Sequence, residues 1–100
     1  MLAGGIEMAL EHVPGKKIAD IKIYALSTCP WCKKAKKLLS DLGVEFYFED
    51  VDLLNGDERQ KAMGIVKKWN PSGSFPTIVI NDSKCIIGFK EDEIKEFLKQ

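Results

Sequence analysis

The sequence lacks a net charge, because 15 lysine and arginine side chains balance 15 aspartate and glutamate side chains. A strongly basic or acidic surface is what draws a protein toward nucleic acid or an anionic membrane. This chain has no such global field. We therefore expect neither nucleic acid nor a membrane among its partners, and we expect any effect of charge to be local.

Cysteine is also scarce, with three in 100 residues. Small secreted domains carry a denser, even set of cysteines, whereas here Cys29 and Cys32 form a close pair and Cys85 stands apart. The apolar stretches fall far short of the roughly 20 residues of a membrane-spanning helix, and residues 1–7 lack the basic region of a signal peptide. We expect a soluble protein in a reducing cytoplasm, and we take it to be a monomer.

Hydrophobic residues make up 45% of the chain, which is enough for one buried core, and the pattern divides the chain near residue 20. Residues 1–19 form an N-terminal extension, and residues 20–100 form the regular domain. The extension has apolar residues at helical spacing that predict a short helix ending at Pro14-Gly15, with a loosely ordered segment as the alternative because Gly4-Gly5 disfavours a helix. These apolar residues are Leu2, Ile6, Ala9, Leu10 and Val13.

The regular domain alternates apolar patterns typical of strands and helices, separated by glycine, proline and asparagine turns. The first strand, helix and second strand make a βαβ unit, in which the two strands are parallel. A third and a fourth strand form an antiparallel hairpin. The predicted order is βαβαββα, with strands at 21–26, 44–51, 77–80 and 85–87, and helices at 30–42, between Asp57 and Asn70, and from Glu91 to Lys99.

The segment Cys29-Pro30-Trp31-Cys32 lies between the first strand and the first helix. Two cysteines three residues apart lie on the same side of a helical turn, so their sulfurs can close a small disulfide ring with little backbone movement. A helix N-terminus stabilises a thiolate. We therefore assign Cys29 as the nucleophile and Cys32, one turn deeper, as the resolving thiol.

Two neighbouring features bear on this chemistry. Four lysines follow Cys32, and they either favour the thiolate and attract anionic partners or form a solvated helix face: Lys33, Lys34, Lys36 and Lys37. Farther along, Phe75-Pro76-Thr77 places a proline directly before the third strand, where it cannot donate a ladder hydrogen bond and can hold the preceding peptide bond cis.

A structural zinc site is the alternative from another class, because Cys29, Cys32, Cys85 and His12 make up a three-cysteine, one-histidine set. Their spacing is unlike that of zinc sites. Cys85 lies in the apolar run of the fourth strand, where a buried structural thiol is the simpler interpretation. We expect no metal.

The combination of these features resembles a glutaredoxin over residues 20–100. The features are a strand, Cys-Pro-aromatic-Cys at a helix start, the Pro76-Thr77 strand entry and Gly88 beyond the last hairpin. The resemblance implies a thioredoxin fold, with a four-stranded mixed sheet in the order 2-1-3-4 and helices on both faces. It implies a cis bond between Phe75 and Pro76, lying beside Cys29.

The same resemblance implies a substrate surface. The backbone next to the cis-proline pairs with a bound thiol or peptide, so Phe75 would donate and accept hydrogen bonds, with Pro76 and Thr77 alongside. Pro30 and an exposed Trp31 would belong to the docking surface.

Gly88-Phe89 sets this chain apart from the glutaredoxins that use glutathione. Those proteins carry Gly-Gly followed by an acidic pair, whereas this segment reads Gly88-Phe89-Lys90-Glu91-Asp92. Phe89 would crowd the site of the γ-glutamyl group. The pattern is closer to the glutaredoxin-like electron donors of ribonucleotide reductase, so the resemblance points to another thiol or a flavoprotein reductase as the electron source.

Together, these features predict a thiol–disulfide oxidoreductase that reduces protein disulfides or mixed disulfides through Cys29 and Cys32. The chemistry needs no resident cofactor, because the electrons come from an external thiol or reductase. An iron–sulfur scaffold, in which two copies share a cluster through Cys29 and an external thiol, is the related alternative. Pro30 directly after Cys29 argues against it.

Overall fold

The apolar runs of the sequence form a five-stranded mixed sheet in the computed structural model, which describes residues 10–99. The neighbouring strands β2 and β3 are parallel, and the other pairs are antiparallel. The central strands β2 and β4 are the most deeply buried, as their near-continuous apolar sequences require. In spatial order the strands are β1 (Glu11–Val13), β3 (Phe46–Asp50), β2 (Ile21–Ala25), β4 (Thr77–Ile80) and β5 (Lys84–Ile87).

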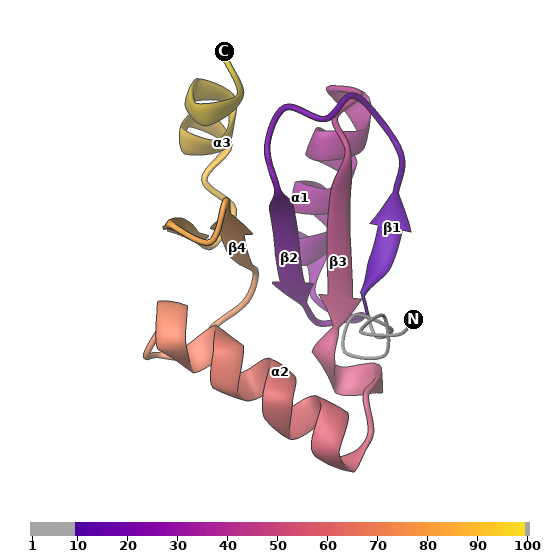
Figure 1. Ribbon diagram of the computed structural model, residues 1–100, viewed down its shortest axis with the longest axis vertical. Helices are drawn as coiled ribbons and strands as arrows, with labels where there is room; N and C mark the ends of the chain where they lie inside the picture. Colours follow the sequence, from indigo (N-terminus) through magenta and orange to yellow (C-terminus); the bar gives the residue numbers. More distant parts are fainter. Residues whose placement is uncertain (1–9, 100) are drawn as a thin grey trace.

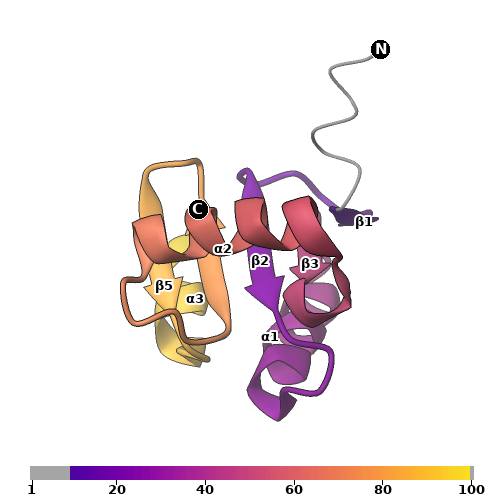
Figure 2. The same cartoon turned by 90° about the horizontal axis from the view of Figure 1, so that it is seen from below.

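In the described part of the chain, three α-helices cover the two faces of the sheet, with α2 on one face and α1 and α3 on the other (Figure 2). A single turn of 3₁₀-helix, η2, follows β3 and leads toward α2 (Figure 1). None of the helices within residues 10–99 is long and apolar enough to cross a membrane. The helices are α1 (Pro30–Asp41), η2 (Val51–Leu53), α2 (Gly56–Trp69) and α3 (Glu91–Leu98).

The core has two parts, one on each face of the sheet. On the α1 and α3 face, Leu39 and Ile94 pack against Ile23 and Phe46. On the α2 face, a smaller cluster is formed by Tyr24, Val51, Ala62, Val66 and Val79. Residues of α1 spaced three and four apart share one buried side. That buried side includes Cys32, together with Ala35 and Leu39, so one of the two thiols belongs to the core.

The thioredoxin fold and the order of its four principal strands are confirmed, but the sheet has a fifth strand that the sequence analysis did not predict. The predicted order 2-1-3-4 corresponds to β3-β2-β4-β5. The additional strand, β1, pairs antiparallel with β3 at the edge of the sheet. The prediction of a four-stranded sheet is therefore wrong in strand number and right in the order of the strands it named.

The additional strand lies in the N-terminal extension, where a helix was one of two expectations. Residues 11–13 are extended, so a helix continuing to Val13 is wrong, and residues 1–9 lie outside the described residues. Three edge residues are too few for their spacing to separate helix from strand. Beyond the strand, Gly15 lets the chain approach Val44 closely, because a Cβ there would lie 2.6 Å from the Val44 carbonyl carbon. The proposed boundary at residue 20 stays a prediction.

Candidate active site

The two neighbouring thiols occupy different environments at the start of α1. Cys29 is the N-cap residue, with extended backbone, and Pro30 occupies the first turn, where its missing N–H costs nothing. The Cys29 Sγ accepts a hydrogen bond from the backbone N–H of Cys32, at 3.3 Å. The Cys29 side chain is partly exposed, so its sulfur combines solvent access with a hydrogen-bond donor.

Cys32 is fully buried one turn farther along, within the core on the α1 face. Burial, and after it the hydrogen bond and charge of Cys29, raise the pKa of its thiol to about 12, although the backbone of Leu26 and the ammonium group of Lys36 act in the opposite direction. In the reduced protein Cys32 is therefore a protonated thiol at neutral pH. This difference in accessibility agrees with a surface nucleophile and an internal resolving thiol.

The loop before Cys29 is fixed by Asp52, which lies in η2. The Asp52 carboxylate accepts hydrogen bonds from the backbone N–H of Ser27 at 2.8 Å and from its hydroxyl at 2.6 Å. These bonds from Ser27, the hydroxyl first, lower the pKa of Asp52. The guanidinium of Arg59 donates to the Asp52 carbonyl oxygen at 2.8 Å and ties η2 to α2. The position of the Cys29 loop therefore depends on a segment that follows β3.

The peptide bond between Phe75 and Pro76 is cis, as the resemblance implied. The loop before it is organised by the buried Asn70, whose side-chain amide donates to the Ser74 carbonyl at 3.0 Å and to the Thr77 hydroxyl at 3.1 Å. The Thr77 hydroxyl in turn donates to the Ser74 carbonyl at 2.8 Å. Thr77 is fully buried, so its side chain holds this loop, and a contact of Thr77 with substrate stays a prediction.

Four of the predicted substrate residues line one hollow of about 240 Å³: Trp31, Phe75, Gly88 and Phe89. The Trp31 side chain is 55% exposed, and its ring stacks on that of Phe89 with the centroids 6.1 Å apart. The ammonium of Lys34 lies 4.8 Å from the Trp31 ring centroid. The structure therefore brings residues from the two ends of the predicted domain into one aromatic surface at the first turn of α1.

Gly88 joins this surface to the cis-proline loop. Its backbone N–H donates to the carbonyl oxygen of Pro76 at 2.8 Å, and its φ of 84° lies in the left-handed region that favours glycine. This geometry turns the chain at the end of β5 so that Phe89 lies against Trp31. The glycine found from the sequence therefore has a definite backbone role.

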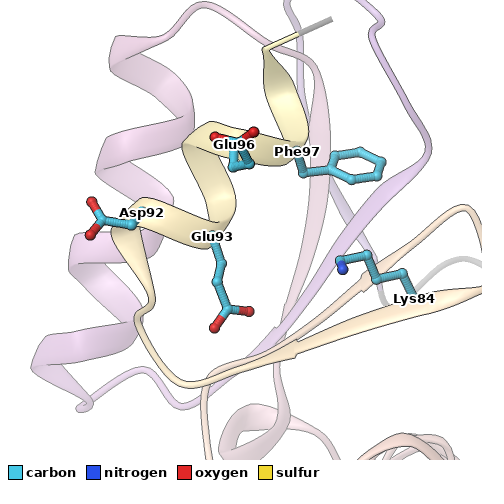
Figure 3. A pocket seen from close by; sticks show the side chains of 5 residues that line it. All are labelled: Lys84, Asp92, Glu93, Glu96 and Phe97. Carbon is cyan, nitrogen blue, oxygen red and sulfur yellow. The ribbon is translucent and has the colours of Figure 1, made fainter.

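A larger hollow, of about 580 Å³, lies away from the thiols, between α3 and the start of β5 (Figure 3). Its lining is mostly charged, and Figure 3 shows Asp92 directed away from Lys84. Within residues 10–99, no three His, Cys, Asp or Glu side chains gather closely enough to hold a metal ion. The four residues of the zinc alternative are thus not brought together. The hollow is lined by Lys84, Asp92, Glu93, Glu96 and Phe97.

The sequence analysis missed the polar residues that hold the site in place. Asp52 accepts a hydrogen bond from a loop that is distant in sequence, and Asn70 donates side-chain hydrogen bonds within its own loop. The periodicity of the sequence reveals neither interaction. Of the four lysines, Lys36 alone is half-buried, in an ion pair with Asp50, and the other three are exposed. A polar residue at the end of a strand or helix, or within two residues of it, was the available signal, as Asp50, Asp52 and Asn70 show.

Comparisons with known proteins agree with this geometry. The family model described as Glutaredoxin matches residues 21–85. A glutaredoxin-like 8.6 kDa protein of the rubredoxin operon in Clostridium pasteurianum is 34% identical over 80 residues, which are 80% of this chain and 99% of that protein. The family match includes both thiols and the cis-proline, and it ends before Gly88-Phe89.

Solved structures show the same relationship. The glutaredoxin of Methanosarcina mazei Go1 has a TM-score of 0.85 and 52% identity, covering 92% of this chain and 89% of that one. Methanoredoxin of Methanosarcina acetivorans has a TM-score of 0.83 and 52% identity, covering 86% and 90%. The family model, the relatives and the solved structures all identify the same family, and the paired thiols at the start of α1 are consistent with its chemistry. The chain therefore belongs to the glutaredoxin family of thiol–disulfide oxidoreductases.

Proposed function

We propose that this protein reduces protein disulfides or mixed disulfides by a two-thiol mechanism, in which Cys29 attacks and Cys32 resolves. The observation that carries the proposal is the contrast between the two sulfurs. Cys29 is partly exposed at a helix N-cap and accepts a backbone hydrogen bond, whereas Cys32 is wholly buried one turn away. A single-thiol mechanism would leave the second, adjacent sulfur without a role.

In the first step the Cys29 thiolate attacks one sulfur of the substrate disulfide. A bond forms between Cys29 Sγ and that sulfur, and the substrate's S–S bond breaks. The other substrate sulfur leaves with the electron pair and takes a proton from water. The backbone N–H of Cys32 points at Cys29 Sγ in the reduced protein and stabilises the attacking anion.

In the second step Cys32 attacks Cys29 Sγ, forms the Cys29–Cys32 disulfide and releases the remaining substrate sulfur as a thiolate. Formation of the mixed disulfide removes the charge of Cys29, which is one of the causes that raise the pKa of the Cys32 thiol. The thiol that is protonated at rest therefore becomes easier to ionise when its attack is required. An external reductant then returns both thiols to the reduced state.

The aromatic surface and the cis-proline loop supply the substrate site in this proposal. A segment carrying the disulfide would lie extended along the backbone of Phe75 and Pro76. An apolar neighbour of that disulfide would occupy the hollow between Trp31 and Phe89. Lys34, beside the Trp31 ring, favours a partner with an acidic rim.

Phe89 supports a reductant other than glutathione. Its ring stacks on Trp31 and contributes to the wall of the hollow next to Gly88. A side chain at this position occupies space that a second glycine would leave open to a tripeptide. We propose another thiol, or a flavoprotein of the thioredoxin reductase type, as the electron source. We also propose that the protein works in a reducing cytoplasm, with which its three unpaired cysteines are consistent.

The thiol roles are tested by measuring disulfide reduction with the wild type, Cys29→Ser and Cys32→Ser. Cys29→Ser should abolish turnover, because the attacking sulfur is lost. Cys32→Ser should stall as a mixed disulfide on a protein substrate, which mass spectrometry of the quenched reaction detects. Full activity in the Cys29 variant would refute the mechanism.

The reductant is tested by supplying electrons from glutathione with its reductase or from a thioredoxin reductase. The wild type should turn over faster with the flavoprotein. Phe89→Gly should gain activity with glutathione, whereas the matched neighbour Lys90→Gly, which changes an exposed residue, should not. Efficient turnover of the wild type with glutathione would overturn this part of the proposal.

A further inference from the structure

Lys36 differs from the other lysines of α1 in its surroundings. Its ammonium donates to the Asp50 carboxylate at 2.8 Å, and the two side chains are only 22% and 15% exposed. The same ammonium lies 4.1 Å from the ring centroid of Phe48. A long, flexible lysine side chain normally extends its charge into water. Here Asp50 and Phe48 hold that charge at the margin of the core instead.

The helix directs Lys36 toward the resolving thiol. Residues four apart in a helix share one side, and a helical side chain leans toward the helix N-terminus. Lys36 follows Cys32 by four positions, so its side chain lies over the turn that carries Cys32. The end of β3 reaches the same place, because Asp50 pairs with Ala25 at the end of β2, four residues before Cys29.

We propose that Lys36, held by Asp50, is a positioning residue for the second step, and that its charge assists the attack of Cys32 on the mixed disulfide. This inference rests on the two-thiol mechanism proposed above. Two charged neighbours affect the Cys32 thiol, namely Cys29, which opposes its ionisation, and Lys36, which favours it. When Cys29 becomes part of the mixed disulfide, its charge disappears and that of Lys36 remains.

The step is balanced without a further reactant. Cys32 gives its proton to water and attacks Cys29 Sγ, so that the Cys29–Cys32 bond forms and the bond from Cys29 to the substrate sulfur breaks. The substrate sulfur leaves with the electron pair and is protonated by water. Lys36 transfers no proton in this scheme, because it contributes a fixed charge near the forming thiolate.

Single-turnover reaction of the reduced protein with dipyridyl disulfide separates the two steps. Attack by Cys29 releases one equivalent of thiopyridone, and resolution by Cys32 releases a second. The probe is neutral, so changes in surface charge do not alter its approach. We expect Lys36→Gln to leave the first phase unchanged and to slow the second by about tenfold between pH 6 and 9, which corresponds to a shift of about one pH unit in the rate profile.

Two variants complete the test. Lys36→Arg keeps the charge and should restore most of the second-phase rate. Lys37→Gln removes an exposed lysine, paired with Asp41 at 3.0 Å on the same helix, and should match the wild type in both phases. A second phase in Lys36→Gln as fast as in the wild type, or equally slow in Lys36→Arg, would overturn the role of this charge. Absence of a second phase in the wild type would instead refute the two-thiol mechanism itself.

Discussion

The polar region around Cys29 and the apolar region around Cys32 are held in place by different interactions, although the two cysteines lie within one turn of helix. Around Cys29, loops are held by side-chain hydrogen bonds, which Ser27 donates to Asp52 and Asn70 donates to Ser74. The position of the Cys32 side chain is instead set by apolar packing in the core cluster that also contains Ala35 and Leu39. The difference shows how one fold keeps one sulfur partly exposed and the other buried and protonated at neutral pH.

The two regions also differ in how sensitive they should be to substitution. Apolar packing is close to native density, so removing buried volume leaves a cavity with a substantial cost. When a hydrogen bond in the partly exposed polar region is lost, water can replace the missing partner. The cost of losing such a bond is therefore smaller, unless a buried partner is left unsatisfied. A graded series of substitutions and modifications can therefore test the comparison.

The largest expected difference is in thiol reactivity. In a Cys85→Ser background at pH 7, iodoacetamide should label Cys29 on the order of a thousandfold faster than Cys32, because a buried thiol supplies almost no thiolate. The pKa of Cys32, raised to about 12 by burial first and then by Cys29, accounts for the protection. Mass spectrometry of peptides from the reduced protein gives both rates. Comparable rates would remove the distinction between the two regions.

The next largest effect concerns the apolar region. Leu39→Ala should lower the free energy of unfolding by about 2–5 kcal/mol, because Leu39 lies almost completely buried on the side of α1 that faces the core. Leu42→Ala, at a side chain 43% exposed beside the same helix, is the matched control and should cost less than about 1 kcal/mol. Urea denaturation followed by circular dichroism measures both. Equal costs would show that packing under Cys32 contributes little.

An intermediate effect is expected from the cis-proline loop. Asn70→Ala removes the amide that donates to the Ser74 carbonyl and the Thr77 hydroxyl, and it should cost about 1–3 kcal/mol of unfolding free energy. Its KM for a disulfide substrate should rise more than its kcat falls, because the loop orients the substrate in the proposed mechanism. Ser72→Ala serves as control, because it removes a hydroxyl that donates to the Asn70 side-chain amide oxygen and also contacts the Ser74 hydroxyl, but it leaves the Asn70 amide N–H bonds in place. A loss in Ser72→Ala as large as in Asn70→Ala would contradict the central position of Asn70.

The residues of the active site that could be predicted from the sequence are those with a local signature. The spacing of Cys29 and Cys32 between a strand and a helix, and a proline at a strand entry, specify geometry within a few residues. Gly88 and Phe89 required the family pattern as well. Their stacking with Trp31 depends on the whole sheet, which brings the end of β5 to the start of α1.

The residues that could not be predicted act between segments. Ser27 and Asp52 are 25 positions apart, and Lys36 and Asp50 are 14 apart, so each pair is set by how β3 lies beside β2 and α1. The strand β1 was missed for a related reason. Three residues at an edge gain most of their stability from pairing with β3, and that partner is not evident in their own sequence.

The smallest expected effect concerns Asp52, and it depends on pH. Hydrogen bonds from Ser27 hold the pKa of Asp52 in the folded protein below the ordinary value of 3.8. The ionised Asp52 carboxylate therefore contributes its full stabilisation at pH values above 3.8. This stabilisation is lost as the pH falls through the lower pKa of the folded state. Asp52→Asn should therefore be less stable than the wild type at pH 7, and the difference should shrink at about pH 3. Urea denaturation at both values measures it, with Asp41→Asn, an exposed carboxylate on α1, as control. A difference that stays constant with pH would show that the charge of Asp52 does not hold the Cys29 loop, and the polar region would then depend on Asn70 more than on η2.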